Sequence, residues 1–352
     1  MITRREFLRR GGAGLASFGL AGLTDGVSGW FEDAWGTETG ETLITILHTN
    51  DVHSRIDPFP EDGSRNAGMA GAARRATLIR RIRDENPNTL LLDAGDTFQG
   101  TPYFNLFRGE VDFRVMTALG YDAMTIGNHD FDGGMDGLAQ AARFAEFELI
   151  SANYDFSGTA LANRVKPYLV RPVGKIRVGI FGLGVGLDGL VSESLRPGVG
   201  YADPFPVAES VVRRLREQER CALVICLSHL GHKGYAGDPG DQDLARQVAG
   251  IDLIVGGHSH TFMDAPERTA HGDRETLVYQ VGWGGIYLGR VDFRLTPKGE
   301  LLDVRAMAVP VDASVHASAL PVDALPVDAL PVDVRPVDAL SANAPPAPAL
   351  RG

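Results

Sequence analysis

Cysteine is scarce in this sequence of 352 residues, which contains only Cys221 and Cys226. The two lie five residues apart in an apolar run, so on a β-strand their side chains would point to opposite faces and could not form a disulfide. This excludes a disulfide framework, and we expect two buried free thiols. Because 44% of the residues are hydrophobic, the chain can build the core of one large or two medium domains.

An excess of positive charge is also missing. The chain has 34 Lys and Arg residues against 45 Asp and Glu residues, which gives a net charge of −11. This balance argues against non-specific binding of nucleic acid, which needs a basic face. An acidic protein that handles an anionic substrate needs local positive charge, and metal ions can supply it.

No apolar run is long enough to span a bilayer. The run Gly11–Leu23 has about 13 residues, whereas a spanning helix needs about 20. It follows Arg4-Arg5-Glu6-Phe7-Leu8, and together they resemble a bacterial twin-arginine export signal. We therefore treat residues 1–40 as signal and linker. We expect export to the periplasm or cell envelope, with membrane contact only through an uncleaved signal.

Apolar runs of strand type alternate with helical patterns over most of the chain, which predicts βαβ units and a sheet covered on both faces. The expected strands are 43–48, 89–92, 121–126, 149–152, 175–183, 222–227, 251–255, 276–281 and 288–295, the last antiparallel or at an edge. The expected helices are 68–86, 111–119, 136–147, 206–220 and 241–249. We interpret the arginines of the first helix as a solvated face.

The character of the sequence changes after Leu302. Ala319–Asp338 repeats the pattern Ala-Leu-Pro-Val-Asp. A proline in every repeat is incompatible with a helix or a central strand. We predict an extended or disordered tail over residues 313–352, which either only tethers or carries a partner-binding motif.

Polar side chains follow five of the predicted strands directly. They are Asp51 and His53, Asp96, Asn128 and His129, His229, and His258 and His260. Strand carboxyl ends gather at one edge of a parallel sheet, so these side chains should meet there. Carboxylate, amide and imidazole ligands suit divalent ions such as Mn, Zn, Fe or Co. There are more of them than one ion needs, and they fit two ions about 3.5–4 Å apart that share a carboxylate.

The ordered set of motifs resembles the calcineurin-like dinuclear metallophosphatases and, more narrowly, the catalytic domain of the 5′-nucleotidase family. The motifs are Thr49-Asn50-Asp51-Val52-His53, Gly95-Asp96-Thr97-Phe98-Gln99-Gly100, Asn128-His129-Asp130-Phe131-Asp132, Ser228-His229 and Gly256-Gly257-His258-Ser259-His260. The resemblance implies an α/β fold over residues 41–312. It would be a layered αββα arrangement, with two mixed sheets flanked by helices and a metal site at the carboxyl ends of the strands.

The same resemblance implies roles for individual residues. One divalent ion would be bound by Asp51, His53 and His260, and a second by Asn128, His229 and His258, with Asp96 bridging the two. Mg is a further candidate for these ions, besides Mn, Zn, Fe and Co. His129 would stabilise the transferring phosphoryl group, oriented by Asp132, and could also protonate the leaving oxygen. Two positions depart from the family pattern. His260 stands where the family often has Gln, and Asp130, to which we assign no chemical role, stands where it often has Glu.

The function implied is that of an exported phosphoesterase that hydrolyses phosphomonoesters, nucleotides above all, by attack of a metal-bridging hydroxide. The alternatives are a 2′,3′-cyclic nucleotide phosphodiesterase, a sulfur-ester hydrolase on the same site, and a non-catalytic envelope binding module. Family members commonly carry a carboxy-terminal nucleotide-binding domain, which we do not expect here. A separate polypeptide could supply it.

Overall fold

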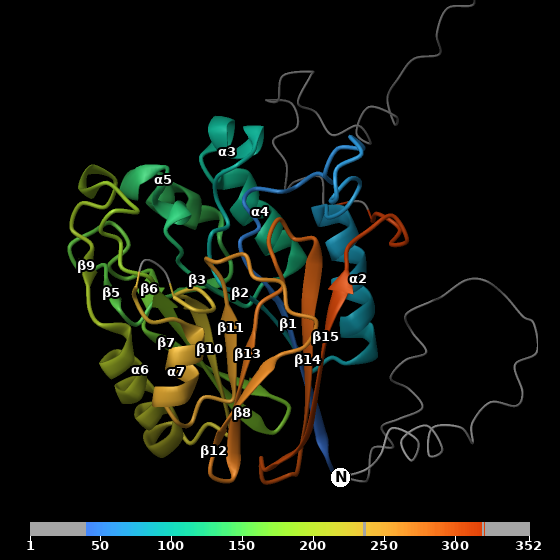
Figure 1. The fold of residues 1–352 in the computed structure, drawn as a ribbon, viewed down its shortest axis with the longest axis vertical. Coiled ribbons are helices and arrows are strands. Elements are labelled where there is room, and N and C mark those ends of the chain that lie inside the picture. Colours follow the sequence, from blue (N-terminus) through green and yellow to red (C-terminus); the bar gives the residue numbers. More distant parts are fainter. Residues whose placement is uncertain (1–39, 235–236, 319, 321–352) are drawn as a thin grey trace, which may run out of the picture. The chain divides into compact units, whose positions relative to one another are not determined.

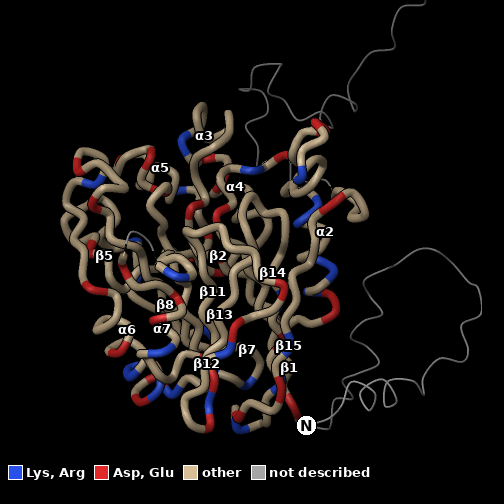
Figure 2. Tube along the Cα trace, viewed as in Figure 1, with Lys and Arg blue, Asp and Glu red and all other residues tan. Residues whose placement is uncertain are grey.

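The computed structural model describes residues 40–234, 237–318 and 320. The predicted export signal and almost all of the predicted tail lie outside these residues. No helix of the described part is long and apolar enough to cross a membrane. Lys and Arg residues are interspersed with Asp and Glu along it (Figure 2).

Seven strands form the first sheet, which is mixed. Their order is β15 (Leu301–Pro310), β14 (Tyr287–Leu295), β1 (Thr42–Thr49), β2 (Thr89–Asp93), β3 (Ala123–Thr125), β4 (Glu148–Ile150) and β6 (Val165–Lys166). The strands from β1 to β6 in this order run parallel, whereas β14 is antiparallel to both of its neighbours.

Six strands form the second sheet, which is mixed as well. Their order is β12 (Glu267–His271), β13 (Arg274–Tyr279), β11 (Leu253–Gly256), β10 (Leu223–His229), β8 (Ile176–Gly184) and β7 (Tyr168–Val173). The four inner strands are parallel, and the two edge strands are antiparallel to their neighbours. A small ribbon pairs β5 (Tyr154–Asp155) with β9 (Gly200–Tyr201).

Alternate side chains of the central strands enter different cores, because successive residues of a strand point to opposite faces. In β1, Ile44 and Ile46 join the core that both sheets share, whereas Leu47 packs toward the helices. In β10, Ile225 joins the shared core and Val224 a third cluster. Strands buried on both faces require continuous apolar runs, which is why these runs lack a polar alternation.

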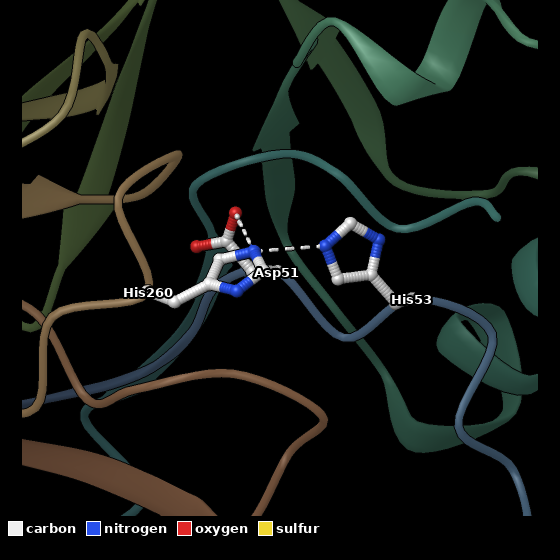
Figure 3. Close-up of side chains that lie close together, drawn as sticks. All are labelled: Asp51, His53 and His260. Carbon is white, nitrogen blue, oxygen red and sulfur yellow. Dashed lines mark hydrogen bonds and ion pairs between the residues drawn. The ribbon is translucent and has the colours of Figure 1, made fainter. Parts of the chain in front are cut away.

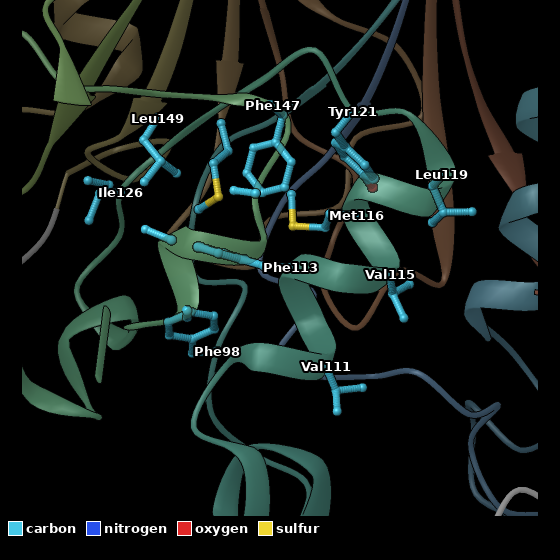
Figure 4. Packing of buried hydrophobic residues seen from close by; sticks show 14 of the residues in the cluster. Phe98, Val111, Phe113, Val115, Met116, Leu119, Tyr121, Ile126, Phe147 and Leu149 are labelled. Carbon is cyan, nitrogen blue, oxygen red and sulfur yellow. The ribbon is translucent and has the colours of Figure 1, made fainter. Parts of the chain in front are cut away.

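Helices cover the outer face of each sheet. The first sheet carries α2 (Ala72–Glu85), α3 (Pro102–Phe107), α4 (Glu110–Leu119) and α5 (Gly134–Ala141), and the second carries α6 (Pro204–Arg213) and α7 (Asp241–Gln247). Figure 4 shows part of the core beneath α4, where Phe113 packs between Phe98 and Phe147. The expected order of helix, sheet, sheet and helix is confirmed (Figure 1).

Some details differ from the sequence predictions. β14 is antiparallel as expected but lies inside the sheet, because β15, which was not predicted, forms the edge. Arg75 of α2 is only 2% exposed rather than solvated, and its guanidinium packs against the backbone of Gly285. The two cysteines are buried and free, as predicted. Both lie in the same cluster, because Cys221 precedes the strand and does not lie on its opposite face.

Candidate metal centre

The predicted ligands lie on loops that leave strands of both sheets. Asp51 and His53 follow β1, Asp96 follows β2, Asn128 follows β3, His229 ends β10, and His258 and His260 follow β11. The sequence pattern predicts a single sheet edge. The structure instead brings the carboxyl ends of three strands of the first sheet to those of two strands of the second.

Five of the seven predicted ligands have a left-handed backbone. The φ angles are 49° at Asp51, 49° at His53, 55° at Asp96, 69° at His258 and 51° at His260. Residues with a Cβ rarely adopt this region, and such strain is concentrated at functional sites. Hydrogen bonds between the loops maintain this strained backbone. The amide of Asp51 donates to the carbonyl of Gly95 at 3.0 Å, and the amide of His53 donates to that of Asp96 at 3.1 Å.

Two glycines let the loops approach one another closely. A Cβ on Gly127 would lie 2.2 Å from Oδ1 of Asp96. A Cβ on Gly257 would lie 2.8 Å from Nδ1 of His229 and 2.9 Å from the carbonyl of Ala94. Only glycine fits such contacts, so these positions allow the ligands of different strands to converge.

Asp51, His53 and His260 form the first group of converging side chains (Figure 3). The two imidazole Nε2 atoms are 3.0 Å apart, and Nε2 of His260 is 3.5 Å from Oδ1 of Asp51. Nδ1 of His53 lies 3.0 Å from the carbonyl of Phe98. A carbonyl can only accept, so Nδ1 carries the proton and the lone pair of Nε2 points into the group, as a metal ligand requires.

Asp96, His229 and His258 form the second group. Nδ1 of His229 donates to the carbonyl of Ala94 at 2.7 Å, and its Nε2 lies 3.0 Å from Oδ2 of Asp96. Oδ1 of Asn128 is buried and has no hydrogen-bond partner among the described residues. A buried acceptor of this kind is costly unless a cation or another donor meets it, so the donors present fit divalent ions.

The charges of the centre support the same interpretation. Burial raises the pKa of Asp51 to about 8. Burial also opposes ionisation of Asp96, but the cationic His229 holds the pKa of Asp96 below its ordinary value. Burial lowers the pKa values of His258 and His260 to about 4, so both rings are neutral at pH 7. The two neutral rings can offer lone pairs to a divalent ion, whereas Asp51 and His229 would release their protons when an ion binds.

His129 and Asp132 stand beside the two groups and belong to neither. Nδ1 of His129 lies 2.9 Å from Oδ2 of Asp132, and both side chains are about one-third exposed. The ring of His129 lies 5.4 Å from that of His53, centroid to centroid. The hydrogen bond to Asp132 raises the pKa of His129, against the effect of burial. The pair therefore presents a polarised imidazole at the edge of the centre.

Asp130, to which the sequence assigned no role, holds two of the loops together. Its Oδ2 accepts from the amides of Gly127 and Asp96 at 2.8 and 3.1 Å. Its Oδ1 accepts from the amides of Thr97 and Phe98 at 3.0 and 3.2 Å. Nothing in the sequence distinguishes this buried carboxylate from its exposed neighbours, because its partners are backbone groups.

Asn50 and Gln280 also support the centre, and the sequence patterns did not single them out. Asn50 donates to Asp51 and to the carbonyl of Gly282, both at 2.6 Å. Gln280 accepts from Ser259 and donates to the carbonyl of Gly257, at 2.9 and 2.5 Å, and so holds the loop of His258.

Comparison with known proteins identifies relatives of this chain. Residues 44–262 match the family model described as calcineurin-like phosphoesterase. The trifunctional nucleotide phosphoesterase protein YfkN of Bacillus subtilis is 34% identical over 312 residues, which are 80% of this chain and 19% of that protein. The 5′-nucleotidase of Homo sapiens is 35% identical over 301 residues, 78% of this chain and 50% of that protein.

A solved structure has the same fold. The 5′-nucleotidase precursor from Thermus thermophilus superposes with a TM-score of 0.71 at 34% identity, over 79% of this chain and 56% of that one. The chain thus spans about half the length of these 5′-nucleotidases and about a fifth of YfkN.

Proposed function

We propose that this chain, which belongs to the calcineurin-like phosphoesterase family, is a metal-dependent hydrolase of phosphomonoesters and that nucleotides are its substrate class. The observation that carries the proposal is the His129–Asp132 pair beside two groups of converging ligands. A site that only bound metal would have no use for a polarised imidazole outside the ligand groups. The nucleotide class is supported by the relatives, whose names describe nucleotide phosphoesterases and 5′-nucleotidases.

The ligand assignment is part of this proposal. Asp51, His53 and His260 would hold one divalent ion, Asn128, His229 and His258 would hold the other, and Asp96 would serve both. Ions held there would supply Lewis-acid chemistry, lowering the pKa of a bound water and neutralising the oxygens of a phosphoryl group. The protein holds these ligands on loops fixed by Asp130 and by hydrogen bonds between the loops.

His129 acts directly on the substrate. Asp132 accepts from its Nδ1 and raises its pKa, so near neutral pH a larger fraction of the ring is protonated than in a free histidine. A protonated imidazole stabilises negative charge on the transferring phosphoryl group and donates a proton to the leaving oxygen. Asp132 keeps the ring in the orientation that this requires.

The amino-terminal segment directs export to the periplasm or envelope, residues 41–312 form the catalytic unit, and the repeat tail tethers it. A separate polypeptide that binds the nucleobase could be held by this tail. If another protein co-purifies with the full chain but not with a chain ending at Asp312, that result would support both the tethering role of the tail and the partner. If neither chain recovers another protein, both the tether and the partner are contradicted. Replacing Arg4 and Arg5 with Lys should reduce export, as measured by cell fractionation. Unchanged export would contradict the assignment of a twin-arginine signal.

The central test is His129→Ala, measured against His316→Ala. His316 is an exposed histidine after the last strand and serves as the control. We expect kcat for AMP to fall about 10²–10⁴-fold in the first variant, as for loss of an acid or electrostatic group, with metal content unchanged. The control should retain full activity. Loss of both ions in His129→Ala would show that His129 is itself a ligand.

A substrate screen tests the reaction class. Wild-type protein is supplied with divalent ions and offered AMP, 2′,3′-cyclic AMP, an aryl phosphate and a sulfate thioester. Preference for AMP supports the proposal, and preference for the cyclic diester or the sulfur ester would replace it with that alternative. Bound metal without turnover of any of them would indicate a binding module.

A further inference from the structure

His260 is the most weakly enclosed of the candidate ligands. Its side chain is 41% exposed, whereas those of His229 and Asp96 are 0% and 2% exposed. Its backbone is left-handed, with φ at 51°. His53 and His229 are each oriented by a carbonyl that accepts from Nδ1. The orientation of His260 therefore calls for a different explanation.

Trp283 supplies that orientation from a distant part of the chain. Its indole lies nearly parallel to the imidazole of His260, with an interplanar angle of 11° and ring centroids 5.7 Å apart. This is an offset stack, which is a favoured arrangement of two aromatic rings. It restricts rotation of the imidazole out of the plane that aims Nε2 at Asp51 and His53, 3.5 and 3.0 Å away.

The loop that carries Trp283 is fixed to the metal centre. The amide of Gly284 donates to the carbonyl of Asp51 at 2.7 Å. Phe59 packs edge-on against the indole, with centroids 5.4 Å apart and an angle of 79°. The guanidinium of Arg55 covers the ring of Phe59 at 4.2 Å. Trp283 is thus held by Phe59 as well as by His260, and its position is set by the same loop that presents Asp51 and His53.

We propose that Trp283 is a positioning residue for His260 and sets the affinity of the first ion. This inference rests on the ligand assignment made above. An imidazole that coordinates a cation becomes poorer in electrons, and an electron-rich indole face attracts such a ring. The stack is therefore stronger with the ion bound than without it, so it favours binding. Residues that orient metal ligands typically contribute 10–100-fold to affinity.

The test compares Trp283→Ala and Trp283→Phe with Phe262→Ala. Phe262 is the matched control, because it is 41% exposed, lies two residues from His260 and stacks on Tyr287 and not on the imidazole. Each protein is loaded with Mn²⁺ or Zn²⁺ and dialysed against increasing chelator, and bound metal is counted by elemental analysis. We expect Trp283→Ala to lose one of two ions at a chelator level about tenfold lower than wild type.

The other variants make the interpretation specific. Trp283→Phe keeps an aromatic face and should retain most of the affinity, and Phe262→Ala should behave like wild type. Thermal unfolding of the metal-free proteins shows whether a variant has lost its fold. If Trp283→Ala has, the metal affinities of wild type, Trp283→Phe and Trp283→Leu are compared instead. Equal retention of two ions by wild type and Trp283→Ala would overturn this inference alone. A wild-type chain that binds no ion would overturn the ligand assignment and this inference with it.

Discussion

Replacing Asp130 with Asn removes half of the acceptors that hold the loops of the metal centre. The carboxylate meets four backbone amides, two on each oxygen, at 2.8–3.2 Å. An asparagine side chain keeps one oxygen and presents an NH₂ group to the other two amides. Each buried donor left unpaired costs roughly 1–3 kcal/mol, so the loss is about 2–6 kcal/mol. Removing a buried charge offsets part of this loss, and we expect about 3 kcal/mol.

The expected loss is large enough to measure directly. About 3 kcal/mol corresponds to a fall of roughly 6–12 °C in melting temperature for a domain of this size class. Unfolding should be followed on metal-free protein, so that loss of metal affinity does not add to the loss of stability. A pH of 8 is suitable, because burial raises the pKa of Asp130 to about 7 and the carboxylate is ionised there.

Asp136→Asn provides the control, since Asp136 is an exposed carboxylate six residues away. Its stability should stay within about 0.5 kcal/mol of wild type, as for most surface substitutions. Melting temperatures that are equal for Asp130→Asn and Asp136→Asn would refute the argument that Asp130 fastens the two loops. Metal content measured afterwards should also be lower in Asp130→Asn, because one of those loops carries Asp96.

A glycine substitution, metal removal and a change of pH provide three further tests. Gly127→Ala places a Cβ 2.2 Å from Asp96 Oδ1 and should lower metal content and activity at least tenfold. In Gly137→Ala of α5 the added Cβ would meet no described atom within 4 Å beyond its own helix backbone, so this variant should gain about 0.5–1 kcal/mol of stability. Similar effects of the two substitutions would contradict this. Chelation should lower the melting temperature, because a ligand at 100 times its Kd adds about 2.7 kcal/mol; an unchanged melting curve would oppose bound ions. Burial raises the pKa of Asp112 to about 7, above its unfolded value of about 3.9. Its contribution to stability is therefore complete below about pH 4 and lost as the pH rises to about 7. The urea midpoint of unfolding should therefore fall less between about pH 4 and pH 7 in Asp112→Asn than in wild type. The same pH dependence in both proteins would refute this role of Asp112.

The layered fold and the family could be predicted from the sequence because the signals are local. Each strand that carries a ligand is a short apolar run, and the polar residues follow it at once. Asp51 and His53 after β1 and His258 and His260 after β11 are examples. The family resemblance read from these motifs is confirmed by the match over residues 44–262.

The features that were not predicted have weaker local signals in the sequence. β15 has partly buried small residues such as Ala306 and Ala308 in place of a continuous apolar run. Its pairing with β14 comes from the rest of the sheet, which a local pattern does not contain. Arg75 was placed on a solvated face because helical spacing does not reveal that Gly285, 210 positions later, leaves room for its guanidinium.

The supporting residues of the site could not be predicted, because their partners are backbone groups or distant rings. Asp130 resembles Asp132 in the sequence, yet one binds four amides and the other binds His129. Trp283 lies 23 positions from His260, on a loop without a ligand of its own. Contacts of this kind depend on tertiary structure and leave no periodic pattern.

The backbone of the site gives an argument for function that does not depend on the family. Asp51, His53 and His260 have a left-handed backbone, and each such residue costs roughly 1–3 kcal/mol relative to an unstrained conformation. A chain selected only for stability would place glycine at these positions, as it does at Gly95 and Gly284. Glycine, however, has no side chain to offer. The strain is therefore retained for the side chains themselves, and what these three share is a set of ligand atoms that converge on one point.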